Sequence, residues 1–287
     1  MSSAAIPRKP LNELPWQLWG AQVAALLRIE LKKNLWAKRS IWIYLVAFAP
    51  AAMFALHALL SPMGRYCSVQ EDTRVLAGTF QIFYLRVGMF FVCMGLFTRL
   101  FRGEIIEKSL HYYFLSPIRR ELLIIGKFLA GLITVILIFG SSILLCFGFV
   151  YGHLGPAGKA YVLNEGGLGQ LSAYLLVTAL ACLGFGSLFL ALSLIFKNPI
   201  LPGIAVLLWE TFHPVAPPWL QKLSITFYLK QLSPVSVPPD GLMALFTVVA
   251  EPVAPWLAVL GLICLSVAIL FLARFLIRKM EISYLAD

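Results

Sequence analysis

Residues 122–151 read LLIIGKFLAGLITVILIFGSSILLCFGFVY, and they carry a single formally charged side chain, Lys127, close to their start. A helix needs about 20 mainly apolar residues to cross the roughly 30 Å hydrocarbon core of a bilayer. Comparable apolar runs occur at 40–60, 76–98, 168–196, 200–213 and 255–277. The sequence therefore predicts an all-α, polytopic membrane protein with six transmembrane helices. Little chain is left for a soluble domain, so we expect 1–287 to form a single transmembrane domain.

The composition supports this class. Hydrophobic residues make up 60% of the chain and charged residues only 13%, with a mean hydropathy of +0.87. Soluble domains carry about 25% charged residues, so a soluble fold is excluded. The net charge of +10 comes from basic residues that flank the apolar runs. That distribution suits a partner such as the lipid bilayer, and it argues against nucleic acid as a partner.

The basic residues also predict the orientation of the chain, because cytoplasmic flanks of membrane helices carry an excess of Lys and Arg. With both termini cytoplasmic, 17 of the 23 Lys and Arg lie inside and five lie outside. We therefore expect a multi-pass protein of the cell (inner) membrane with both termini cytoplasmic. The outside segments would be 61–75, 152–167 and 214–254.

The N-terminal segment 1–39 contains a basic stretch, AQVAALLRIELKKNLWAKR, at 21–39. On a helix one side of this stretch would carry Ala24, Leu27, Leu31 and Leu35, with the basic residues elsewhere. This pattern is typical of a helix that lies in the membrane interface. The alternative is an ordinary positively charged flank of the first span.

The connection 99–127 contains a second amphipathic pattern. One face of a helix there would carry Ile106, Leu110, Tyr113 and Phe114. The opposite face would carry Glu104, Glu107, Lys108 and His111. Pro117 ends this helix and suits the first turn of the next one. We predict a short cytoplasmic helix that is available to a partner. The alternative is a surface helix that packs on the ends of the chain's own membrane helices.

The segment 214–254, which lies before the last span, is rich in proline but also apolar. A solvated linker would be more polar, so we predict short re-entrant helices that dip into the outer leaflet while protein protects them. The alternative is an external loop with a few half-buried turns.

Two formally charged residues fall well inside the expected spans, Arg86 in the second and Glu210 in the fifth. Each lies roughly 15 Å from the end of its span at 1.5 Å per residue. A lone charge at that depth costs at least about 2.5–3.5 kcal/mol, so an intramembrane ion pair between them is a reasonable hypothesis. The alternative is that Glu210 reaches the outer interface.

Several kinds of chemistry have no signature in this chain. It lacks the phosphate-binding loop G-x-x-x-x-G-K-[ST] and the H-E-x-x-H and G-x-S-x-G motifs of zinc peptidases and serine hydrolases. We expect no enzymatic activity and no cofactor. The histidines are scattered along the chain, and roles at helix ends or in the core are favoured over metal ligation; they are His57, His111, His153 and His213.

Three features together resemble the type-2 ABC transporter permeases, the membrane-spanning subunits of bacterial ABC exporters. The first is the basic stretch at 21–39, and the second is FRGEIIEKSLHYYFLSPIRRELLIIGK at 101–127. The third is PPWLQKLS at 217–224, followed by LSP, ahead of the last span. These motifs are loose, but they cover most of the chain.

The resemblance implies that Glu104 to Leu115 forms a coupling helix that docks on a separate ATPase, with 21–39 as a connecting helix beside it. The coupling residues would be Glu104, Glu107, Lys108, His111, Tyr112 and Leu115. The working unit would contain two ABC ATPase subunits and a second permease copy or a homologue. In this unit the partner hydrolyses ATP and this chain moves a substrate across the membrane, most simply by export.

Two other functions remain open from the sequence. One is a non-transporting membrane assembly or anchor subunit that serves maturation of a periplasmic enzyme or cofactor. The other is a membrane-embedded enzyme, which the missing catalytic motifs disfavour. A neighbouring gene for an ABC ATPase would support the permease.

Overall fold

The computed structural model describes residues 16–60, 68–106, 119–235 and 253–279, and within these ranges the regular structure is entirely helical. The N-terminal half contains α1 (Trp16–Trp36), η2 (Lys38–Ser40), α2 (Ile41–Leu60), α3 (Val69–Thr79), η3 (Phe80–Gly88), α4 (Met89–Ile106) and α6 (Arg120–Gly152). The C-terminal half contains α7 (Pro156–Asn164), α8 (Gly167–Ile195), α9 (Ile200–Phe212), η4 (His213–Val215), α10 (Pro218–Gln221), α11 (Ile225–Leu232) and α13 (Pro255–Lys279).

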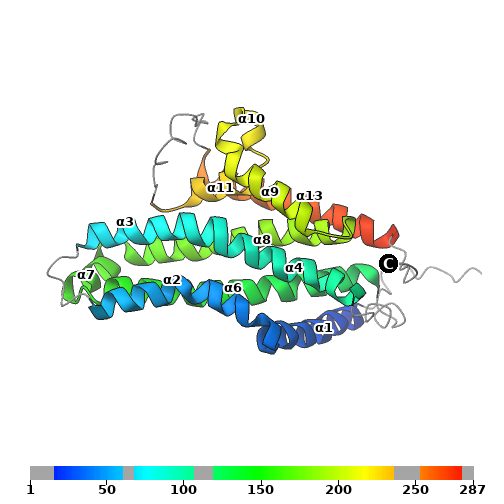
Figure 1. Cartoon of the computed structure of the whole chain (residues 1–287), viewed down its shortest axis with the longest axis horizontal. Coiled ribbons are helices and arrows are strands. Elements are labelled where there is room, and N and C mark those ends of the chain that lie inside the picture. The colour runs from blue at the N-terminus through cyan, green and yellow to red at the C-terminus, as the bar shows by residue number, and fades with distance from the viewer. Residues whose placement is uncertain (1–15, 61–67, 107–118, 236–252, 280–287) are drawn as a thin grey trace, which may run out of the picture.

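Five helices of the described chain are long and apolar enough to cross a membrane. They are α2, the continuous helix formed by α3, η3 and α4, and then α6, α8 and α13. In Figure 1 the first four run side by side along the long axis of the molecule, and α13 lies against α8. The structure thus agrees with the expected all-helical membrane class.

The described residues contain five of the six expected spans. The apolar run at 200–213 forms α9, which has 13 residues and is therefore only about 20 Å long. Pro214 follows it within the short helix η4, where the chain turns toward α10. Proline has no backbone N–H to continue a helix, so the fifth segment ends before it reaches the length of a span.

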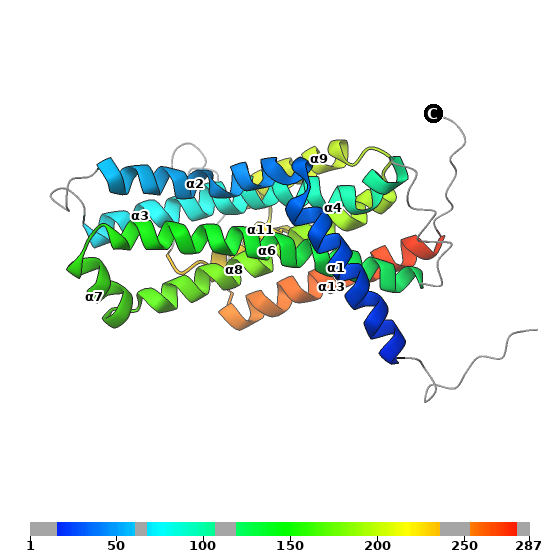
Figure 2. The same cartoon turned by 90° about the horizontal axis from the view of Figure 1, so that it is seen from below.

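α9 and the short helices after it lead the chain away from the end of the bundle that holds α1, and α13 then runs back toward that end. Because of this return, the N-terminal end of α1 and the C-terminal end of α13 lie at the same end of the molecule (Figures 1 and 2). The helix α7 lies at the opposite end. The short helices η4, α10 and α11 occupy part of the predicted re-entrant segment 214–254, and residues 236–252 are outside the described ranges.

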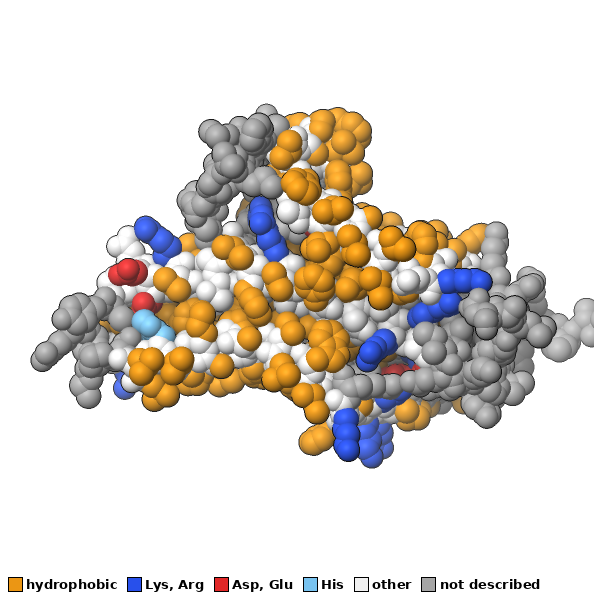
Figure 3. Space-filling view, in the orientation of Figure 1, with side chains coloured by type: hydrophobic (Ala, Val, Ile, Leu, Met, Phe, Trp, Pro, Cys, Tyr) orange, Lys and Arg blue, Asp and Glu red, His pale blue; other side chains and the backbone are white. Residues whose placement is uncertain are grey.

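Hydrophobic and basic side chains occupy different parts of the surface along the long axis of the molecule. In Figure 3 hydrophobic side chains cover the middle of the bundle, and many of the Lys and Arg side chains gather near the end that holds α1. Leucines are exposed on the long helices, for example Leu45, Leu137 and Leu272. Exposure of such apolar side chains to water is unfavourable, so this surface is suited to contact with lipid. That the basic end faces the cytoplasm stays a prediction.

Several hydroxyl side chains within the long helices bond to carbonyl groups of their own helix. The hydroxyl of Thr134 donates to the carbonyl oxygen of Ala130, and that of Ser187 donates to the carbonyl of Gly184. In hydrocarbon an unsatisfied polar group costs several kcal/mol, so this back-bonding is what allows Ser and Thr inside a span.

Glycines let the helices approach one another at the centre of the bundle. The ring of Phe97 on α4 is fully buried, and a Cβ added to Gly131 on α6 or to Gly186 on α8 would lie 2.8 Å and 2.7 Å from its atoms. No side chain larger than hydrogen fits at either position without displacing this ring. Phe97 therefore fixes the spacing of three helices.

The orientation can be tested by labelling introduced cysteines with a membrane-impermeant maleimide in a Cys67→Ser background. Arg119 precedes α6 and Lys159 lies on α7, and both residues are exposed at opposite ends of the α6 helix. We expect Lys159→Cys to be labelled from outside in intact cells and Arg119→Cys only after the membrane is opened. Labelling of both positions from the same side would contradict this topology.

Candidate functional site

A buried ion cluster joins three helices at the end of the bundle that holds α1. Lys127, near the start of α6, is fully buried, and its Nζ lies 2.6 Å from Oε1 of Glu30 on α1 and 2.7 Å from Oε1 of Glu104 on α4. Nζ of Lys33 on α1 contacts the same Oε1 of Glu104 at 3.0 Å. Two carboxylates and two ammonium groups thus form a cluster with no formal net charge, which we call the Lys127 cluster.

The local sequence explains how the Lys127 cluster forms. Leu26, Glu30 and Lys33 follow the i, i+4, i+7 spacing of one face of α1, and this face turns toward the bundle. A Cβ added to Gly126 would lie 2.5 Å from Cδ2 of Leu26. The absence of a side chain at Gly126 therefore lets α1 sit against α6, beside Lys127.

Burial makes it costly to separate the helices that this cluster joins. Glu30 and Glu104 are each only 1% exposed, so neither carboxylate is solvated by bulk water. A buried charge must be paired, because an isolated ion in a low-dielectric region costs several kcal/mol. Charge-assisted hydrogen bonds at these distances supply the pairing. Separation of α1 or α4 from α6 would leave at least one buried charge without its main partner.

A cavity of about 350 Å³ lies beside the Lys127 cluster and is lined by Glu30, Lys33 and Glu104 together with Trp42 and Arg99. The indole of Trp42 on α2 approaches Gly95 of α4, where an added Cβ would lie 2.6 Å from the ring. The cavity thus lies where α1, α2 and α4 meet. It gives the charged groups space to rearrange if these helices move.

The structure places only one of the six predicted coupling residues. Glu104 lies in the last turns of α4 and points into the cluster, so its carboxylate is not available on the surface for docking. The other predicted coupling residues lie outside the described ranges; these are Glu107, Lys108, His111, Tyr112 and Leu115.

The grouping of Glu30, Lys33 and Lys127 was not predicted from the sequence. The sequence pattern predicted one apolar side of this interfacial helix, formed by Ala24, Leu27, Leu31 and Leu35. The side that packs on the bundle instead carries the buried Leu26 and Glu30, and Ala24 is exposed. A signal was present, since Glu30 is the only acidic residue within the basic stretch 21–39. A lone acid among basic residues indicates a specific partner.

The structure does not form the predicted pair of Arg86 and Glu210. The ion pairs among the described residues do not include it, and the Glu210 carboxylate instead accepts hydrogen bonds from the start of α11. Its Oε2 accepts from Ser224 Oγ at 2.7 Å and from the Thr226 amide at 2.9 Å, and its Oε1 accepts from the Ile225 amide at 3.0 Å.

These contacts explain why Glu210 tolerates burial, with 6% of its surface exposed. The first amides of a helix have no partner within the helix and attract negative charge. Glu210 thus ties α9 to α11. Arg86 remains in the same region, because both charges act electrostatically on Lys230 and His213. It lies in η3, a π-helical insertion between α3 and α4.

Comparison of the chain with models of known protein families and with curated proteins gives no match. The assignment of a function therefore depends on the geometry of the Lys127 cluster and on the resemblance seen in the sequence.

We predict that Lys127→Met destabilises the protein far more than Lys33→Ala. The first change leaves two buried carboxylates without their shared ammonium, which costs about 3–5 kcal/mol. Lys33 is 32% exposed, and loss of such a pair costs at most about 1 kcal/mol. Thermal unfolding of the purified variants in detergent measures the difference.

The triple variant Lys127→Met, Glu30→Gln, Glu104→Gln removes both stranded charges and should recover much of the lost stability, because it replaces unpaired ions with neutral groups. Equal stability of Lys127→Met and Lys33→Ala would show that the cluster does not hold the helices together.

Proposed function

We propose that this chain is the membrane-spanning subunit of an ATP-driven exporter of the type-2 ABC class, and that a separate ATPase hydrolyses the ATP. The observation that carries this proposal is the Lys127 cluster. It joins α1, α4 and α6 at the end of the bundle where the segment 107–118 connects α4 to α6. The sequence resemblance described above supports the same function.

The cluster offers a mechanical route from that segment to the membrane helices. Glu104 lies close to the point where α4 leads into 107–118, and Lys127 lies in the second turn of α6, shortly after the same segment. A force on 107–118 acts on both helix ends at once. Because separation of the buried charges is costly, α1 is expected to follow α4 and α6 rather than detach from them.

In this proposal the partner contacts residues of the connection 107–118. The docking residues would be Glu107, Lys108, His111, Tyr112 and Leu115, and Glu104 would act inside the membrane subunit as a positioning residue. Two such subunits would assemble with two ATPases. Closure of the ATPases on ATP would then move the ends of α4 and α6, and the long helices would reorient around the cargo.

The proposal predicts that the full chain, purified from its native membranes with an affinity tag, carries an ABC ATPase in a one-to-one ratio and shows vanadate-sensitive ATP hydrolysis. The double variant Glu107→Lys, Lys108→Glu should retain membrane insertion but lose most of the bound ATPase. Surface charge changes cost only about 0.5 kcal/mol in folding stability, so the loss would report docking.

A matched control is Glu165→Lys, since Glu165 is exposed and lies after α7 at the opposite end of the bundle. This variant should retain the ATPase. If the double variant retains it equally well, 107–118 is not the docking site. A purified complex that contains no ATPase would contradict the proposed function and favour a non-transporting assembly subunit.

A further inference from the structure

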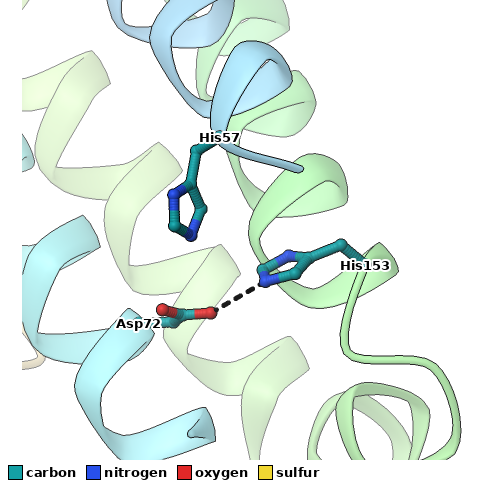
Figure 4. Close-up of side chains that lie close together, drawn as sticks. All are labelled: His57, Asp72 and His153. Atoms are coloured by element: carbon teal, nitrogen blue, oxygen red, sulfur yellow. Dashed lines mark ion pairs between the residues drawn. The ribbon is translucent and has the colours of Figure 1, made fainter. Parts of the chain in front are cut away.

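Three potential metal ligands meet at the end of the bundle opposite the Lys127 cluster. His57 lies in the last turn of α2, Asp72 in the first turn of α3, and His153 directly after α6. One donor atom of each residue lies within 4.8 Å of the donor atoms of the other two. Figure 4 shows the two imidazoles and the carboxylate directed toward a common point. The sequence analysis had treated these histidines as separate structural residues.

The closest pair is His153 and Asp72, whose Nε2 and Oδ2 lie 3.2 Å apart, and the rings of His57 and His153 have centroids 5.4 Å apart. The side chains of His153 and Asp72 are only 6% and 10% exposed. Neither His153 Nε2 nor Asp72 Oδ2 has a hydrogen-bond partner in the described part of the chain. Two buried polar atoms therefore face each other without a hydrogen bond.

The hydrogen bond of the other ring nitrogen of His153 determines whether Nε2 can donate to Asp72. Nδ1 lies 3.0 Å from the carbonyl oxygen of Phe149, and a carbonyl oxygen can only accept, so Nδ1 carries a proton. In the neutral imidazole Nε2 then presents a lone pair to the carboxylate. Two acceptors at 3.2 Å repel each other unless a cation lies between them or Nε2 also gains a proton.

Two of the three helix ends at this place favour a cation, and the third, the N-terminal end of α3, carries the Asp72 carboxylate. His57 and His153 both lie at helix C-termini, where the unpaired carbonyl groups carry partial negative charge. Histidines that bind metals usually donate their second N–H to a backbone carbonyl or a carboxylate, which is the arrangement of His153 and Phe149. The arrangement therefore has both the ligands of a metal site and the outer contact that orients one of them.

We propose that His57, Asp72 and His153 bind one divalent first-row transition-metal ion, for which Zn²⁺ is a suitable probe. Two imidazoles and one carboxylate are typical ligands of Zn²⁺, whereas Ca²⁺ and Mg²⁺ prefer oxygen alone. Ligands at about 2.0–2.1 Å from a tetrahedral metal lie about 3.4 Å from one another. His153 and Asp72 are already close to this spacing at 3.2 Å. The donor atom of His57 lies within 4.8 Å of theirs, so binding requires this side chain to move toward the other two.

A fourth coordination position is open. The three ligands line a cavity of about 300 Å³ together with Glu71 and apolar residues from α2, α3 and α6. Solvent or the exposed carboxylate of Glu71 completes the coordination of a bound ion. This site lies at the end that we expect to face outside, and it is independent of ATPase docking at the other end. Failure of the proposed transport function would leave it unaffected.

The test is equilibrium dialysis of the purified full-length protein against Zn²⁺, with bound metal measured by mass spectrometry. We expect one Zn²⁺ per chain, and His57→Ala and Asp72→Asn should each weaken its affinity by at least about tenfold. Co²⁺ should give the ligand-field absorption of a low-coordinate site in the original protein but not in these variants.

Two controls separate metal binding from folding and from weak surface binding. His57 is exposed, so His57→Ala should elute and unfold like the original protein when metal is absent. Glu165→Gln removes an exposed acid at the same end and should not change the affinity. If the original protein binds Zn²⁺ no more tightly than His57→Ala, the proposal is wrong, and His153 and Asp72 form an imidazolium–carboxylate pair instead.

Discussion

The burial of the Lys127 ammonium group between two carboxylates is the constraint on which the predicted cytoplasmic end of this protein depends. The ammonium is fully buried and reaches both Glu30 and Glu104 at hydrogen-bond distance. Because these two partners come from α1 and α4, the ammonium group on α6 cannot keep both contacts unless both helices stay against it. The oblique helix α1 is therefore part of the folded bundle and not a loosely attached flank (Figure 2).

Two other buried carboxylates of the described chain also have polar partners. Glu210 is satisfied by the first amides of α11, and the carboxylate of Asp72 faces His153 where three helix ends meet. Glu210 and Asp72 thus lie close to helix ends, where backbone groups or a second side chain can reach them. Between these places the surface of the long helices is mainly apolar, as a lipid environment requires, and Arg86 in η3 is an exception.

Much of the helical framework was predictable from the sequence. The run at 168–196 corresponds to α8, which covers Gly167–Ile195, because an apolar run of that length has no other stable arrangement in a membrane. The run at 200–213 gave a shorter helix than expected, since Pro214 ends it. The partners of Glu210 were not predictable. Equal depth in the membrane does not show that two residues are neighbours, and every residue except proline has a backbone amide, so the sequence does not mark which amides bind a carboxylate.

A disulfide between α1 and α6, formed in the double variant Leu26→Cys, Gly126→Cys, would test whether the Lys127 cluster holds these helices together. Cβ of Leu26 lies 3.4 Å from a Cβ added to Gly126, close to the spacing of about 3.5–4.5 Å in disulfides. We predict rapid cross-linking when the Lys127 cluster is intact and much slower cross-linking after Lys127→Met. Equally fast cross-linking in both backgrounds would contradict the claim that the cluster holds α1 on α6.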